Sequence, residues 1–144
     1  MPIAGVVALS DRLLDLGADQ IAVSDTIGIA HPGQVRRVLE ALLARVPVER
    51  IALHFHDTRG TALANVLAAL DFGVSTFDSS AGGLGGCPYA PGASGNLATE
   101  DLLYMLHGLD LHTGVDLDAV ASASRPLAAR VGHPLPSRYL QATG

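Results

Sequence analysis

The strongest constraint on the fold is an apolar periodicity that switches repeatedly between strand-like runs and helical stripes. Residues 20–25, 51–56 and 74–79 form short runs rich in strand-forming residues, and each run ends in polar side chains. Between them, apolar residues recur at helical spacing from Val35 to Val46 and from Leu63 to Leu70. Strands that alternate with helices are typical of parallel βαβ units. The sequence therefore predicts an α/β fold with a parallel sheet.

Helices are also expected at both ends of this alternating region. The first covers residues 4–16, and another begins after Thr99, which we expect to be its N-cap. A last helix follows Asp116, and Pro126 is expected to break or kink it. The tail after residue 132 contains two prolines and is expected to be irregular.

Composition excludes several classes of function. The 144 residues predict a single domain over 1–144, and 49% of them are hydrophobic, which is enough for a substantial core. All 9 basic residues are Arg, against 14 acidic residues, for a net charge of −5. We therefore expect neither nucleic acid nor a membrane as a partner. The single cysteine, Cys87, excludes an internal disulfide.

Two histidines share one face of the second expected strand. Successive side chains of a strand point to opposite faces, so His54 and His56 project together, away from Leu53 and Phe55. Two imidazoles at this spacing can share a divalent metal ion. The alternative is a pair of unrelated polar residues where a strand meets its loop, and the local sequence leaves both interpretations open.

A glycine-rich loop follows the third expected strand and contains the cysteine. Gly82, Gly83, Gly85 and Gly86 give this backbone little restriction, so it can close over a ligand. Cys87 at its end can then act as a general acid, a nucleophile or a metal ligand. The alternative is a surface loop with an inert cysteine. No Gly-Lys-Ser/Thr follows, which disfavours a phosphate-binding loop.

Two further polar residues have a structural and a functional interpretation. Asp25 ends the first expected strand, where it can orient a substrate, act as a base, or bond the backbone of a turn. Asn96 precedes a helix and can be a cap or an oxygen ligand of a metal. Local sequence alone favours the turn and the cap.

Four stretches together resemble the C-terminal part of the 3-hydroxy-3-methylglutaryl-CoA lyases. They are VSDTIGIAHPG, LHFHDTRGTALAN, FDSSAGGLGGCPYAPGASGN and LATEDLLYMLHGLDLHTGVDL. The resemblance extends from about residue 5 to 130, and its most specific run is GGLGGCPY. It implies an α/β fold that is part of a TIM (β/α)8 barrel, namely the last three βα units with C-terminal helices.

The resemblance assigns roles to the residues singled out above. His54 and His56 match the two metal-binding histidines of the family, and Asn96 matches a third, oxygen ligand of Mg²⁺ or Mn²⁺. Cys87 matches the catalytic loop cysteine and Asp25 a catalytic aspartate. In the same family pattern, Glu100 matches an acid that lies behind the metal ligands.

The implied reaction is cleavage of 3-hydroxy-3-methylglutaryl-CoA to acetyl-CoA and acetoacetate, a step of leucine degradation. The cation polarises the substrate oxygens, a base removes the hydroxyl proton, and the loop cysteine helps to protonate the departing enolate. The partner is thus an acyl-CoA substrate. The family forms homo-oligomers, and the oligomeric state of this chain stays open.

A full barrel has eight βα units and about 250 residues, whereas this chain supplies three strands, which match the sixth to eighth. An Arg-Asp pair of the family's first strand has no counterpart here. We therefore expect a C-terminal portion of a longer enzyme that is inactive by itself. The alternatives are another metal-dependent aldolase or acyl-transferring synthase of the same superfamily, and a non-catalytic half-barrel that assembles with a partner chain. The Arg-only, Ala- and Gly-rich composition suggests a bacterial cytoplasm, and a mitochondrial location stays open.

Overall fold

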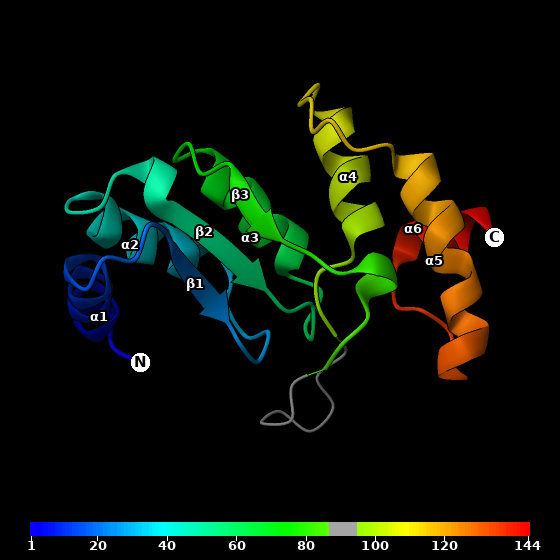
Figure 1. Ribbon diagram of the computed structural model, residues 1–144, viewed down its shortest axis with the longest axis horizontal. Coiled ribbons are helices and arrows are strands. Elements are labelled where there is room, and N and C mark those ends of the chain that lie inside the picture. The colour runs from blue at the N-terminus through cyan, green and yellow to red at the C-terminus, as the bar shows by residue number, and fades with distance from the viewer. Residues whose placement is uncertain (87–94) are drawn as a thin grey trace.

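The computed structural model describes residues 1–86 and 95–144. Helices and strands alternate along the first half of the chain, and three helices follow (Figure 1). Two short 3-10 turns lie at Val48–Arg50 and Ala81–Gly83. The regular elements are α1 (Ile3–Asp15), β1 (Ile21–Asp25), α2 (Pro32–Leu43), β2 (Ile51–Phe55), α3 (Ala62–Leu70), β3 (Thr76–Asp78), α4 (Thr99–Gly108), α5 (Leu117–Val131) and α6 (Arg138–Thr143).

The three strands form one parallel sheet in the order β1-β2-β3, which confirms the predicted α/β class. Helices α2 and α3 lie behind this sheet in Figure 1, α1 lies beside its β1 edge, and no helix crosses its front. Ile51, Leu53 and Phe55 of β2 enter the main core together with Leu39 of α2 and Val66 of α3. The intervening residues of β2 therefore face the side without helices.

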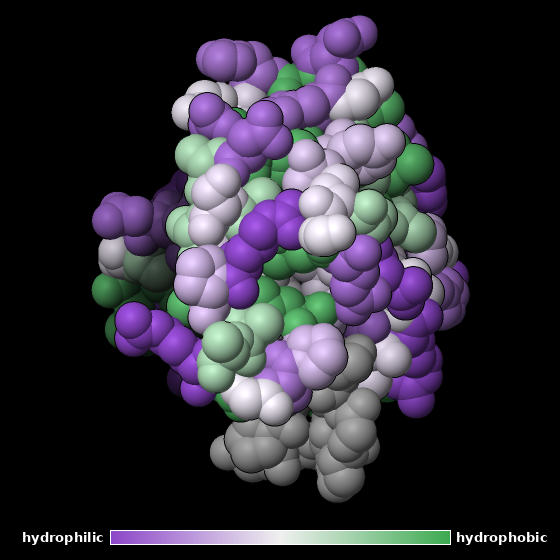
Figure 2. Space-filling view, turned by 90° about the vertical axis from the view of Figure 1, so that its right-hand side faces the viewer, coloured by the Kyte–Doolittle hydropathy of each residue, from purple (hydrophilic) through white to green (hydrophobic). Residues whose placement is uncertain are grey.

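The C-terminal helices extend the molecule beyond the carboxyl ends of the strands. Helix α4 packs against α3 on one side and against α5 and α6 on the other. A second apolar cluster, centred on Ala121, Leu135 and Leu140, joins these helices to the start of the glycine-rich loop. Figure 2 shows the side of α5 and α6, where apolar surface lies between polar side chains. No helix of the described residues is long and apolar enough to cross a membrane.

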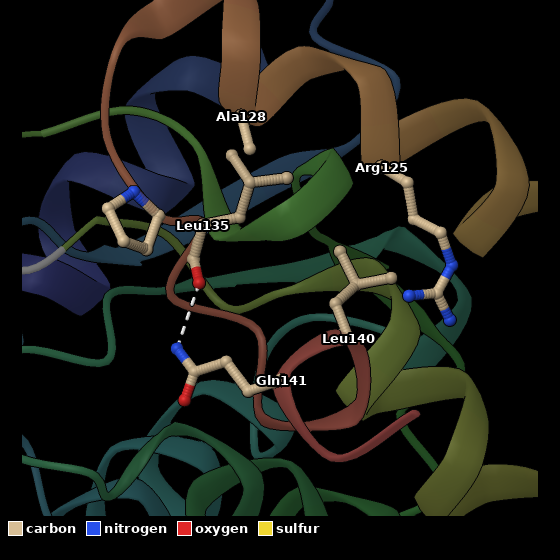
Figure 3. Close-up of a pocket in the computed structure, with 6 residues that line it drawn as sticks. Arg125, Ala128, Leu135, Leu140 and Gln141 are labelled. Carbon is tan, nitrogen blue, oxygen red and sulfur yellow. Dashed lines mark hydrogen bonds between the residues drawn. The ribbon is translucent and has the colours of Figure 1, made fainter. Parts of the chain in front are cut away.

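An apolar pocket of about 300 Å³ lies between α5 and α6 (Figure 3). The side chains of Leu135 and Leu140 both extend toward α5, and Arg125 lies at the edge of the pocket. Gln141 closes one side by donating a hydrogen bond from Nε2 to the Leu135 carbonyl at 2.9 Å. This bond fixes the segment that precedes α6.

Two local expectations were wrong, and of the break or kink expected at Pro126 the break does not occur. Thr99 is the first residue of α4 rather than its cap, and its hydroxyl lies 2.8 Å from that of Ser79. Helix α5 continues through Pro126, so the lost amide bond does not break it. The tail is not irregular throughout, because α6 forms where the Ser137 hydroxyl accepts a bond from the Leu140 amide.

Candidate functional site

The two histidines of the second strand lie side by side on the face without helices. His54 belongs to β2, and His56 follows it directly. Their ring centroids are 5.2 Å apart, with the planes tilted by 58°. His54 is half-buried, whereas only 6% of His56 is exposed. The strand alternation predicted from the sequence therefore does bring both imidazoles together at the carboxyl edge of the sheet.

His56 has an unused ring nitrogen inside the protein. Its Nδ1 is buried and has no hydrogen-bond partner among the described residues. Burial, and then the neighbouring His54, lower the pKa of His56, while the Asp25 carboxylate opposes this shift. The ring is thus favoured in its neutral form, which can donate an electron pair. A buried polar atom without a partner costs free energy, and a bound cation would remove that cost.

Asn96 lies opposite His56 because the segment after the glycine-rich loop crosses the end of β2. The Asp57 amide donates to the Gly95 carbonyl at 3.1 Å, and the Leu97 amide donates to the Phe55 carbonyl at 3.0 Å. These bonds make His56 and Asn96 an antiparallel bridge pair. Side chains of directly opposite residues lie close together on one face.

The Asn96 side chain is held by the glycine-rich loop and does not cap a helix. Its Nδ2 donates to the Leu84 carbonyl at 2.9 Å, and Ala98 is the N-cap of α4. Gly85 permits this contact, because a Cβ atom there would lie 2.5 Å from Nδ2 of Asn96. The amide nitrogen is thereby committed to the loop, so the oxygen Oδ1 is the atom left to act as a ligand.

Glu100 anchors the start of the same loop. It is fully buried, and its two carboxylate oxygens accept the Gly82 amide at 3.0 and 2.9 Å. The Gly82 carbonyl in turn accepts the Ser137 amide at 3.1 Å. Glu100 and the C-terminal segment thus hold the loop from both sides. Gly86 ends this described part of the loop, and Cys87 lies outside the described residues.

Asp25 lies at the end of β1 and shapes its own turn. Its Oδ1 accepts the Ile29 amide at 3.1 Å and its Oδ2 accepts the Ala30 amide at 2.9 Å. The Ala30 carbonyl accepts both the Thr61 hydroxyl and the Asn65 side-chain amide, so the turn is fixed to the loop after β2. This is the turn that local sequence favours, and it keeps Asp25 within electrostatic reach of His56.

The sequence interpretation gave no role to Asp78 at the end of β3. Its Oδ2 lies 3.4 Å from Nδ1 of His54, to which it is also the register partner across the sheet. The sequence does show a polar residue, Asp78, at the end of the neighbouring strand. Its contact with His54, however, follows only from the register of the two strands. In the described part of the chain, no group of three or more His, Cys, Asp or Glu side chains is placed to hold a metal ion.

Comparison with known proteins identifies the family. The HMGL-like family model matches residues 1–126. The chain belongs to this family. Its relative hydroxymethylglutaryl-CoA lyase YngG of Bacillus subtilis is 57% identical over 141 residues, which are 98% of this chain and 47% of the relative. The resemblance noted in the sequence is thereby confirmed.

Solved structures of HMG-CoA lyases share the fold. The Bacillus subtilis lyase superposes with a TM-score of 0.96 over 99% of this chain and 48% of that protein. An HMG-CoA lyase of Acinetobacter baumannii, in complex with coenzyme A and 3-methylmalate, is 47% identical and has a TM-score of 0.90 over 95% of this chain and 45% of that protein. The HMGL-like chain thus spans about half the length of these relatives.

Proposed function

We propose that this HMGL-like chain forms the metal-binding part of an enzyme that cleaves 3-hydroxy-3-methylglutaryl-CoA to acetyl-CoA and acetoacetate. The observation that supports this most is the meeting of His54, His56 and Asn96 at the carboxyl edge of the sheet. Ligands of barrel enzymes bind at this edge of the strands. Family membership and the names of the relatives support the reaction class.

The donor set fits a divalent cation. The rings of His54 and His56 would supply nitrogens, and Oδ1 of Asn96 would supply an oxygen. Mg²⁺ and Mn²⁺ both accept such ligands. When bound, the cation supplies Lewis-acid polarisation of the substrate oxygens. Two imidazoles and one amide bring no negative charge, and residues 87–94 contain no acidic residue, so a carboxylate ligand from the part of the enzyme beyond this chain would complete the site.

The surrounding residues of the chain would position the reacting groups. Asp25 retains a free lone pair on each carboxylate oxygen beyond its bonds to the Ile29 and Ala30 amides, so it can accept the tertiary hydroxyl proton. Glu100 holds Gly82, and with it the start of the loop that leads to Cys87. From that loop Cys87 would donate a proton to the departing acetyl-CoA enolate.

The arginines near the sheet have structural partners in this chain. Arg36 pairs with Asp71 at 2.6 Å, and Nη1 of Arg59 donates to the Gly28 carbonyl at 3.4 Å. Neither belongs to the Arg-Asp pair that the resemblance assigns to the first strand of the family's barrel. We therefore expect the 144-residue chain alone to release almost no acetoacetate, even with Mn²⁺.

A chimera tests the proposal directly. The matched residues of the Bacillus subtilis lyase are replaced by this chain, which the TM-score of 0.96 makes a conservative exchange. We expect the chimera to release acetoacetate from 3-hydroxy-3-methylglutaryl-CoA in the presence of Mn²⁺, and His56→Ala in the chimera to abolish this release. Asp71→Ala, which removes an exposed acid that is paired with Arg36, serves as the control. A folded chimera that binds Mn²⁺ but condenses 2-keto acids with acetyl-CoA instead would refute the proposal.

A further inference from the structure

Asp78 and His54 form a cross-strand pair on the face of the sheet without helices. Parallel strands β2 and β3 place the two residues directly side by side, and Ser24 of β1 occupies the same row on the other side of His54. The Asp78 Oδ2 atom lies 3.4 Å from the His54 Nδ1 atom. Their side chains are 55% and 27% exposed, so the contact lies at the rim of the site rather than in the core.

Other carboxylates near the carboxyl edge of the sheet accept hydrogen bonds from backbone amides. Both oxygens of Asp25 accept amides of its own turn, and both oxygens of Glu100 accept the Gly82 amide. The Asp57 carboxylate accepts the Ala62 amide at 2.9 Å. Asp78 differs from all three, because the contact that it makes in the described part of the chain is with a histidine ring.

A carboxylate beside one ring nitrogen decides what the other nitrogen can do. A neutral imidazole carries one proton, and an acceptor at Nδ1 favours the tautomer with the proton on that atom. The lone pair is then on Nε2, which is free to bind a cation. Metal-binding histidines are commonly fixed in this way by a neighbouring carboxylate.

We propose that Asp78 is a positioning residue for His54: its carboxylate accepts a hydrogen bond from the protonated Nδ1 of the neutral ring, so that the lone pair on Nε2 is presented to a divalent cation. This inference rests on the metal site of the proposed function and adds to it a residue that does not touch the cation. It also gives a role to the strand register, since a shift of β3 by one residue would turn the Asp78 side chain to the opposite face.

Metal binding by the full chain provides the first test. Mn²⁺ affinity is measured by the electron paramagnetic resonance signal of the free ion, for the unmodified chain and for Asp78→Ala. We expect Asp78→Ala to weaken binding about 10- to 100-fold, the usual effect of removing such a partner. Asp78→Glu restores a carboxylate in an exposed position and should recover most of the affinity. Asp71→Ala removes a similarly exposed acid, 57% exposed and paired with Arg36, and should leave affinity unchanged.

The tautomer of His54 provides a second test that needs no metal. Long-range ¹⁵N–¹H spectra at about pH 8, where an ordinary imidazole is neutral, distinguish the two protonated nitrogens. We expect His54 to carry its proton on Nδ1 in the unmodified chain and to lose this preference in Asp78→Ala. A proton on Nε2 in the unmodified chain would overturn the inference, as would an unchanged tautomer in the variant.

His54→Ala separates this inference from the proposed function. If His54→Ala binds Mn²⁺ as the unmodified chain does, the metal site itself is wrong. If His54→Ala abolishes binding but Asp78→Ala does not weaken it, the metal site stands and the role of Asp78 is refuted. Circular dichroism of each variant confirms that the fold is retained.

Discussion

Replacing Gly95 by alanine tests how tightly the backbone beside the proposed ligand Asn96 is held. Gly95 has a φ of +92°, which only glycine adopts readily. An added Cβ atom would lie 2.3 Å from the Gly83 carbonyl oxygen and 2.7 Å from that of Gly85. Both contacts are with backbone, so no side-chain rotation relieves them. The loop itself has to move, and Asn96 moves with it.

The expected loss of stability has two parts. A non-glycine residue in this backbone conformation costs about 1–3 kcal/mol. Overpacking against atoms that cannot rotate away costs a further ~1–3 kcal/mol. Gly95→Ala should therefore lower the free energy of unfolding by about 2–6 kcal/mol, a large share of the roughly 5–15 kcal/mol of a typical domain.

Gly17 is a matched control within the same chain. Its φ of +94° is nearly the same, but nothing lies within 4 Å of the Cβ atom that alanine would add. Gly17→Ala should thus show only the first part of the cost. Urea unfolding followed by circular dichroism gives both free energies, and the difference between the variants measures the contact with the two carbonyls.

Metal binding extends the comparison to the site. Gly95→Ala should weaken Mn²⁺ binding, because the Gly95 carbonyl accepts the Asp57 amide and so holds the segment across from His56. Gly17→Ala should leave binding unchanged. If Gly95→Ala and Gly17→Ala lowered the free energy of unfolding equally, the two carbonyls would add no cost. The argument from close packing would then be refuted.

Three further predictions concern buried or bonded side chains. With a chelator present, the free energy of unfolding should decline as the pH falls below about 6.5. Burial lowers the pKa of His56, so at such a pH the unfolded chain binds a proton that the folded chain does not. His56→Gln should reduce this decline, as measured by urea midpoints at several pH values. Asp101→Ala should cost about 1.5–3 kcal/mol in urea unfolding, because its carboxylate accepts the Ser137 hydroxyl and two amides of α6; Asp101→Asn should cost less. Glu100→Ala should cost ~1–3 kcal/mol by leaving the buried Gly82 amide unpaired, whereas Glu100→Gln keeps an acceptor and should be milder by the same measurement.

Local rules predict the parts of this protein that depend on neighbouring residues in the chain. The two-residue period of a strand is sufficient to place His54 and His56 on one face and Leu53 on the other. The apolar stripe after Pro32 predicts α2 for the same kind of reason, because helical spacing is a property of a short segment. Together with the order of elements, these rules also predict the parallel sheet.

The position of Asn96 beside His56 required the tertiary structure. Local sequence favoured a capping role for Asn96, but the bridge pair depends on how the chain returns after the glycine-rich loop. The helix α6 is similar, since Asp101 supplies acceptors for its first amides from a distant part of the chain. No local pattern records which segments meet in this way.

The sequence by itself thus determined which side chains share a face and which family supplies their chemistry. The tertiary structure decided which of them meet: Asp78 contacts His54 through the register of two strands, and Glu100 contacts Gly82 across the loop. The physical reason is that strand and helix periods arise from the covalent geometry of a few residues. Contacts between distant segments arise instead from packing the whole chain, where each pairing depends on all the others.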